Sequence, residues 1–143
     1  MGFQRTGLLP EALRVGFPEI DEQHEEVFAR LESLKGACFG SNDLPVADFV
    51  SLVNAIAQHF AAEEWFAEQA NVEFSQHAMI HRDNLKSMRN ALDVALNGLS
   101  NPYSFLRFIE FWFERHIVEY DQPFASNLQF GDQYVSAKDA ADV

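Results

Sequence analysis

All of the chain's five histidines lie in sequence of helical character, at spacings that suit metal binding. His59 precedes Glu63 by four residues, and His77 precedes His81 by four residues. Residues four apart on a helix share a face, with Cβ atoms about 5–6 Å apart, so each pair can reach one ion. The candidate metal ligands are His24, His59, Glu63, His77, His81, His116 and Asp121.

The joint placement of these side chains argues for a metal more strongly than any one of them. A lone histidine such as His24 is more often a surface or core residue than a ligand, and chance often produces single pairs. Here, however, every histidine falls within strongly apolar sequence on one of four successive helical segments. Buried imidazoles and carboxylates without partners would cost several kcal/mol. Two metal ions that share two bridging carboxylates would use all the candidates, and imidazole with carboxylate suits iron.

Several other metal classes are excluded by spacing. No Glu-x-x-His occurs, so the ferritin-like arrangement is absent. No His-Glu-x-x-His occurs either, which removes the usual helical zinc protease motif. Cys38 is the chain's one cysteine, and it excludes an intramolecular disulfide and a cysteine-based zinc or iron–sulfur site.

The elements that must position these residues are helices. Apolar residues recur at helical spacing and are interrupted by glycine, proline and asparagine. We expect helices over about 19–37, 45–71 and 75–97. A fourth helix should begin with Asn101 as its N-cap and Pro102 at its first position. The predicted fold is therefore all-α, an antiparallel up-down four-helix bundle with the metal site in its core.

The predicted organisation is one domain over residues 1–143. Residues 1–17 should form an N-terminal arm packed across the bundle, and residues 131–143 a loose, polar C-terminal tail. The formal net charge of −12 disfavours nucleic acids and anionic membrane surfaces as partners. No apolar run approaches the roughly 20 residues of a membrane span. Since the N-terminus also lacks a secretory signal, we expect a cytoplasmic protein.

Four segments of the chain resemble the bacterial hemerythrins (bacteriohemerythrins). They read VGFPEIDEQH at residues 15–24, HFAAEE at 59–64, HAMIH at 77–81 and WFERHIVEYD at 112–121. The resemblance spans roughly Val15 to Leu128, and all of the ligand positions match in identity and order.

The resemblance implies a non-haem di-iron protein that binds dioxygen reversibly for carriage, storage or delivery. By this resemblance, one iron takes three histidines, and the other takes His24 and His59. Glu63 and Asp121 bridge both ions, together with a solvent-derived oxo or hydroxo bridge. The second iron is five-coordinate, and its open position binds dioxygen. The histidines of the first iron are His77, His81 and His116.

Two residues are expected near bound dioxygen. Trp112 lies one turn before His116 and should line the ligand pocket. Glu119 departs from the resemblance, because the residue three after the fourth-helix histidine is usually apolar and faces that pocket. An ideal α-helix would put Glu119 on the stripe of His116. Glu119 is then either a solvated flank residue or an inward carboxylate that fills the open position or acts as a general acid or base.

Pro123 predicts a distortion of the fourth helix. Proline cannot donate a hydrogen bond to the carbonyl of Glu119, and its ring crowds that carbonyl. We therefore expect a kink or break around 119–122, followed by a further helical turn over 124–128. Such a distortion would help Asp121 reach the metals, since a position five residues after His116 is off the ideal helix face.

Two alternatives to an oxygen carrier stay open. One is a redox or oxygen sensor that acts through a separate, unidentified protein partner. The other is a peroxide-reactive or rapidly autoxidising di-iron enzyme, in which an inward Glu119 modifies the pocket. The sequence allows a monomer or a small oligomer.

Overall fold

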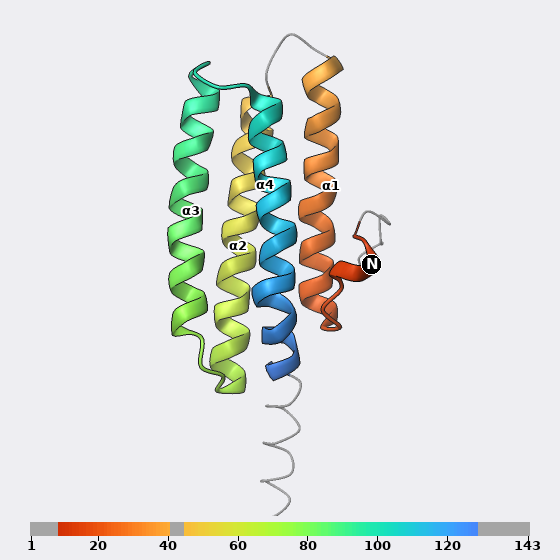
Figure 1. Cartoon of the computed structure of the whole chain (residues 1–143), viewed down its shortest axis with the longest axis vertical. Coiled ribbons are helices and arrows are strands. Elements are labelled where there is room, and N and C mark those ends of the chain that lie inside the picture. The colour runs from red at the N-terminus through yellow and green to blue at the C-terminus, as the bar shows by residue number, and fades with distance from the viewer. Residues whose placement is uncertain (1–8, 41–44, 129–143) are drawn as a thin grey trace, which may run out of the picture.

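A computed structural model describes residues 9–40 and 45–128, and within these residues the chain is all-helical with no strand (Figure 1). The predicted tail over 131–143 and the first eight residues of the predicted arm lie outside the described residues. The principal elements are α1 (Pro18–Gly40), α2 (Val46–Ala70), α3 (Ser75–Leu96) and α4 (Pro102–His116), preceded by the short 3₁₀ turn η1 (Glu11–Leu13) and followed by the π-helix η2 (Ile117–Asp121).

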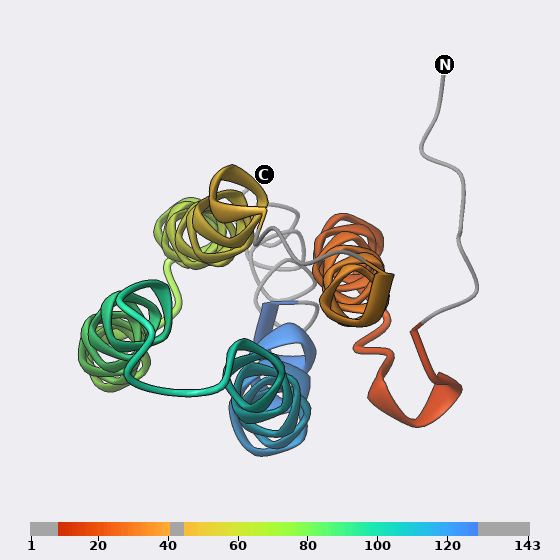
Figure 2. The same cartoon turned by 90° about the horizontal axis from the view of Figure 1, so that it is seen from above.

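The four long helices form a closed ring around a common core. Each helix packs against the next one along the chain, and α1 also packs against α4. The connection from α2 to α3 lies at one end of the ring and that from α3 to α4 at the other (Figure 1). A view along the helices shows the four elements surrounding a shared centre (Figure 2). Side chains from all four helices can therefore meet in one place.

The helix boundaries agree closely with those expected from capping residues. The Asn101 side chain accepts hydrogen bonds from the backbone N–H groups of Tyr103 and Ser104, at 2.8 and 3.3 Å, with Pro102 at the first helical position. The expected end of α1 was wrong by three residues, because the helix continues to Gly40. A glycine inside a helix, such as Gly36, costs only about 1 kcal/mol, which is too little to end a helix that packs along its length.

The predicted distortion before Pro123 takes the form of the π-helix η2. The N–H of Gln122 donates to the carbonyl of Ile117, five residues earlier, instead of four. The chain then continues as a helix over 122–128, so it does not break. Because a π-helix turns less per residue than an α-helix, Asp121 comes to the same side as His116, and its Oδ1 lies 3.1 Å from Nε2 of His116.

The buried interior is divided by a polar layer. The larger apolar cluster includes Phe49, Ile56 and Leu106, all completely buried. The smaller cluster contains Ile20, Ala67, Phe124 and Leu128. Ile20 and Ala67 lie about one turn from the predicted ligands His24 and Glu63, and Phe124 and Leu128 follow Asp121 by about one and two turns. The candidate metal ligands therefore occupy the layer between two apolar regions.

Residues 9–17 pack against the bundle. Leu9 and Leu13 are buried, and the Gln122 amide donates to the carbonyl of Ala12 at 2.8 Å. The Asp21 carboxylate accepts hydrogen bonds from the N–H groups of Val15 and Gly16 at 2.8 and 3.2 Å.

In the described part of the chain, no helix combines the length and apolar character that a bilayer crossing requires.

Two nearby phenylalanines of α4 provide a matched test of this core. Phe113 is fully buried, whereas Phe111 is 63% exposed. We expect Phe113→Ala to lower the free energy of unfolding by about 3–5 kcal/mol, because the lost ring leaves a cavity. Phe111→Ala should change it by about 0.5 kcal/mol or less. Urea unfolding followed by circular dichroism measures both, and equal losses would contradict the packing.

Candidate metal centre

The seven predicted ligands meet at the centre of the bundle. They come from every long helix and from η2, and they are buried, apart from the half-buried His77. They form two groups that share Asp121, and within each group the ligand atoms lie within 4.8 Å of one another. The first group is Glu63, His77, His81, His116 and Asp121, and the second is His24, His59 and Asp121.

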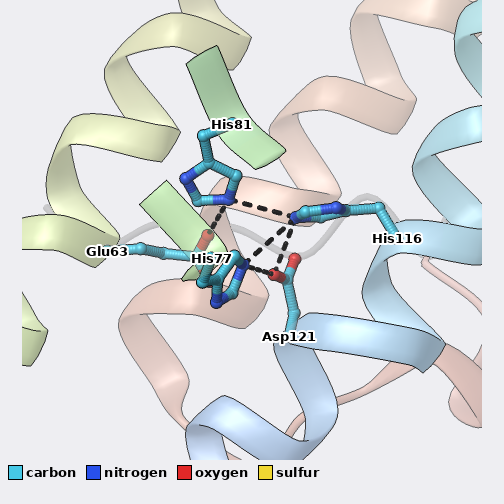
Figure 3. Close-up of side chains that lie close together, drawn as sticks. All are labelled: Glu63, His77, His81, His116 and Asp121. Carbon is cyan, nitrogen blue, oxygen red and sulfur yellow. Dashed lines mark hydrogen bonds and ion pairs between the residues drawn. The ribbon is translucent and has the colours of Figure 1, made fainter. Parts of the chain in front are cut away.

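The larger group points three imidazole nitrogens at one another (Figure 3). The Nε2 atom of His116 lies 3.1 Å from Nε2 of His81 and 3.4 Å from Nε2 of His77. Two nitrogens that each lie about 2.0–2.1 Å from one ion are separated by about 2.9–3.4 Å at octahedral or tetrahedral angles. The observed separations are therefore those of ligands around a single metal.

The smaller group repeats this spacing with two histidines. The Nε2 atoms of His24 and His59 are 3.0 Å apart. Asp121 Oδ2 lies 3.0 Å from the former nitrogen and 3.8 Å from the latter. The second group thus offers two imidazoles where the first offers three.

The two carboxylates lie between the groups. Asp121 directs Oδ2 toward His24, while its Oδ1 lies 3.2 Å from Nε2 of His77 and 3.1 Å from Nε2 of His116. Glu63 Oε1 lies 3.4 Å from Nε2 of His59 and 3.3 Å from Nε2 of His81. Each carboxylate is therefore within reach of both groups, as a bridging ligand must be.

The carboxylate oxygens lack hydrogen bonds of their own. Glu63 and Asp121 are completely buried, and none of their four side-chain oxygens has a hydrogen-bond partner, although imidazole nitrogens are close by. Leaving buried charged oxygens unpaired costs several kcal/mol. Cations placed between the two groups would satisfy these oxygens and the Nε2 lone pairs together, so the residues present fit a two-metal centre.

Burial and mutual repulsion tune the ionisation of the cluster. Burial, reinforced by His24, lowers the pKa of His59 to about 4. Burial and the neighbouring histidines lower the pKa of His81 to about 2. Burial and Asp121 raise the pKa of Glu63 well above its ordinary value. Burial also raises the pKa of Asp121, but its contacts with surrounding histidines outweigh this effect and hold it well below the ordinary value. Neutral imidazoles are the form that binds metals.

Residues outside the cluster hold the imidazoles in place. The Nδ1 atom of His59 lies 2.6 Å from the Gln23 side-chain oxygen, which can only accept a hydrogen bond. Nδ1 of His59 therefore carries the proton, and its Nε2 lone pair is free to face the cluster. Phe60 stacks on His81, with ring centroids 3.8 Å apart and planes 3° from parallel. Gln23 could not be recognised from the sequence, because it meets His59 across two helices and no spacing within one helix indicates the contact.

The two acidic residues beside His24, Asp21 and Glu25, contact the segment before α1. Asp21 holds the backbone of Val15 and Gly16, as described above. Glu25 is buried, and its carboxylate lies 3.9 Å from the Arg14 guanidinium. Both contacts fasten the segment before α1 to the bundle.

Two aromatic residues of α4 flank different groups. Trp112 stacks on His116, with centroids 4.7 Å apart and planes 19° from parallel, so it lies beside the three-histidine group. Its Nε1–H donates to Asn84 Oδ1 at 2.7 Å. The ring of Phe113 instead approaches His24 and His59 edge-on, at 5.2 and 6.0 Å between centroids. Of these two residues, Phe113 therefore borders the two-histidine group and Trp112 the three-histidine group, while the Phe60 ring also approaches His59 at 6.1 Å.

Glu119 does not join the cluster. Its side chain is 49% exposed, and its carboxylate pairs with the Arg115 guanidinium at 3.1 Å. The expectation of a shared stripe with His116 assumed α-helical geometry, whereas Glu119 lies within the π-helix. The wider turn directs Asp121 inward and Glu119 outward. Of the two alternatives for Glu119, the structure supports the solvated flank residue.

No protein-family model matches the chain, and no solved structure matches it. The chemistry of the centre is therefore inferred from its own residues and geometry.

The low pKa of His59 predicts a pH-dependent stability of the metal-free protein. Below pH 6.5 the unfolded chain takes up a proton at His59, which the folded chain does not do until about pH 4. Acidification from pH 7 to 4.5 should therefore destabilise the metal-free protein by about 2–3 kcal/mol relative to a His59→Gln variant. Urea unfolding of the unmodified protein and of His59→Gln, both in the presence of a chelator, measures the difference in unfolding free energy at each pH. Titrating groups that both proteins contain, such as Glu63, largely cancel in this difference. A difference that does not vary with pH would contradict the buried, neutral His59.

Proposed function

We propose that this protein is a hemerythrin-like, non-haem di-iron protein that binds dioxygen reversibly, on an antiparallel up-down four-helix bundle. The observation that carries the proposal is the position of Asp121, whose two oxygens face two separate groups of imidazole nitrogens. A carboxylate that reaches both groups is the ligand that a two-metal centre needs. Imidazole and carboxylate ligands together favour iron.

The two ions have unequal ligand sets in this proposal. His77, His81 and His116 bind one ion, and His24 and His59 bind the other, with Glu63 and Asp121 shared. The two-histidine ion thus has one protein ligand fewer. An open coordination position separates a reactive metal site from a closed structural one. A pair of ferrous ions held by these residues would supply the redox chemistry that reversible dioxygen binding needs.

The protein's own contribution is to orient the ligands and to keep water away. Gln23 fixes the proton of His59 on Nδ1, which leaves Nε2 available. Phe113 and Phe28 pack edge to face beside the two-histidine group, with centroids 5.6 Å apart, and both rings are buried. A dry apolar wall excludes the water and protons that would promote loss of a reduced oxygen species. Glu119 points away from the cluster and pairs with Arg115, so it cannot act as an acid or base at the two-histidine group. This favours an oxygen carrier over an enzyme.

Iron stoichiometry tests the ligand assignment with two adjacent glutamates. Glu63 is completely buried in the cluster, whereas Glu64 is exposed. The unmodified protein should bind two irons per chain. Glu63→Ala should bind one iron or fewer, because a bridging ligand is lost. Glu64→Ala should retain both. Metal analysis of gel-filtered, iron-loaded protein measures the ratio. Full iron content in Glu63→Ala would contradict the assignment.

The visible spectrum tests the oxygen chemistry. Anaerobically reduced, iron-loaded protein should develop a ligand-to-iron charge-transfer band when air is admitted and lose it when air is removed. Glu119→Leu should leave this cycle unchanged, because the Glu119 carboxylate is exposed and paired with Arg115. Direct conversion to a ferric spectrum, with no reversible band, would contradict the proposed carrier.

A further inference from the structure

A groove of about 430 Å³ opens on the outer side of the bundle between α3 and α4. A volume of this size falls in the range of small-molecule sites, which is about 300–1,000 Å³. The groove lies outside the metal cluster and meets it only at His116. The residues that matter most for its chemistry are Asn84, Phe108, Phe111, Trp112, Arg115 and Glu119.

The walls of the groove are mainly aromatic and incompletely covered. Phe108 is 44% exposed and Phe111 is 63% exposed, and because they lie three residues apart on α4 they expose apolar surface next to each other. Trp112 is half-buried, and its indole N–H is engaged by Asn84. Such flat, apolar walls favour a flat aromatic ligand, because stacked or edge-on ring contacts add to the gain from burying apolar surface.

The two charged side chains of the groove form an ion pair. The Arg115 guanidinium lies 3.1 Å from the Glu119 carboxylate and 5.9 Å from the centre of the Phe111 ring. The pair offers donor N–H groups beside an acceptor carboxylate and carries no net charge. The chain as a whole has a net charge of −12, which disfavours anionic ligands. An uncharged ligand with a hydroxyl group suits both conditions, since a hydroxyl can donate to Glu119 or accept from Arg115.

We propose that this groove binds an uncharged, flat aromatic alcohol of the phenol, naphthol or hydroquinone class. The ligand would lie against Trp112, which stacks on His116 at the edge of the three-histidine group. This site is separate from the open position of the proposed iron centre. Binding in the groove does not require metal, so either proposal can fail without the other.

Nuclear magnetic resonance of the full-length, ¹⁵N-labelled chain tests the site, with 2-naphthol as the probe. The chain has two tryptophans, and each indole N–H gives its own signal. Trp65 lies on α2, away from this groove, and a Trp65→Phe variant assigns the pair. The Trp112 signal should shift saturably, with a Kd on the order of 1 mM or below, while the Trp65 signal stays in place.

Two exposed phenylalanines provide the matched variants. Phe111→Ala removes a wall of the groove and should weaken 2-naphthol binding about fivefold. Phe39→Ala removes a ring that is 77% exposed on α1, outside the groove, and should leave the Kd unchanged. The amide spectrum of each variant reports whether the fold is retained.

Three results would overturn the proposal. The first is a Trp112 signal that does not move, or that moves no more than Trp65. The second is tighter binding of 2-naphthoate than of 2-naphthol, which would make the groove an anion site at Arg115. The third is a Trp112 signal that changes on dilution of the protein alone and resists 2-naphthol, which would mean that a second copy of the chain covers this face. Repeating the titration with zinc-loaded protein separates the groove from the metal centre, because the same Kd is expected.

Discussion

The arrangement of the bundle interior depends on two carboxylates that are buried without hydrogen bonds. Glu63 and Asp121 are completely enclosed, and five imidazoles surround them. Apolar residues pack above and below this layer, so solvent does not supply the hydrogen bonds that these oxygens lack. A pair of cations between the imidazole groups would provide the partners that these oxygens lack. The closed ring of helices, the aromatic contacts and the outer hydrogen bond at Gln23 all hold donor atoms in positions that suit such a pair.

The aromatic residues contact the two groups of histidines in different ways. Phe60 and Trp112 lie flat on His81 and His116, which restricts ring rotation on the three-histidine side. On the two-histidine side, Phe113 presents its edge to His24 and His59. This asymmetry agrees with the unequal numbers of histidines.

Much of the fold and the candidate ligand set could be predicted from local spacing, and the failures have a common cause. Pairs such as His77 and His81 depend only on helix periodicity, and Asn101 and Pro102 determine a helix start by local chemistry. Glu119 was harder, because its direction depends on a π-helix whose exact register Pro123 does not dictate. The hydrogen bond from His59 to Gln23 and the neighbours of Phe113 arise between helices, where spacing along one helix carries no information.

The π-helix η2 also has a mechanical consequence. Asp121 ends η2 inside the cluster, and the next residue, Gln122, holds the carbonyl of Ala12 in the segment before α1. That segment is fastened in turn by Asp21, three residues before His24. Two adjacent residues at the end of η2 thus make contacts in different places: Asp121 is a candidate metal ligand, and Gln122 is hydrogen-bonded to the segment before α1. A rotation of η2 that moved Asp121 out of the cluster would therefore also strain the hydrogen bond from the Gln122 amide to the carbonyl of Ala12.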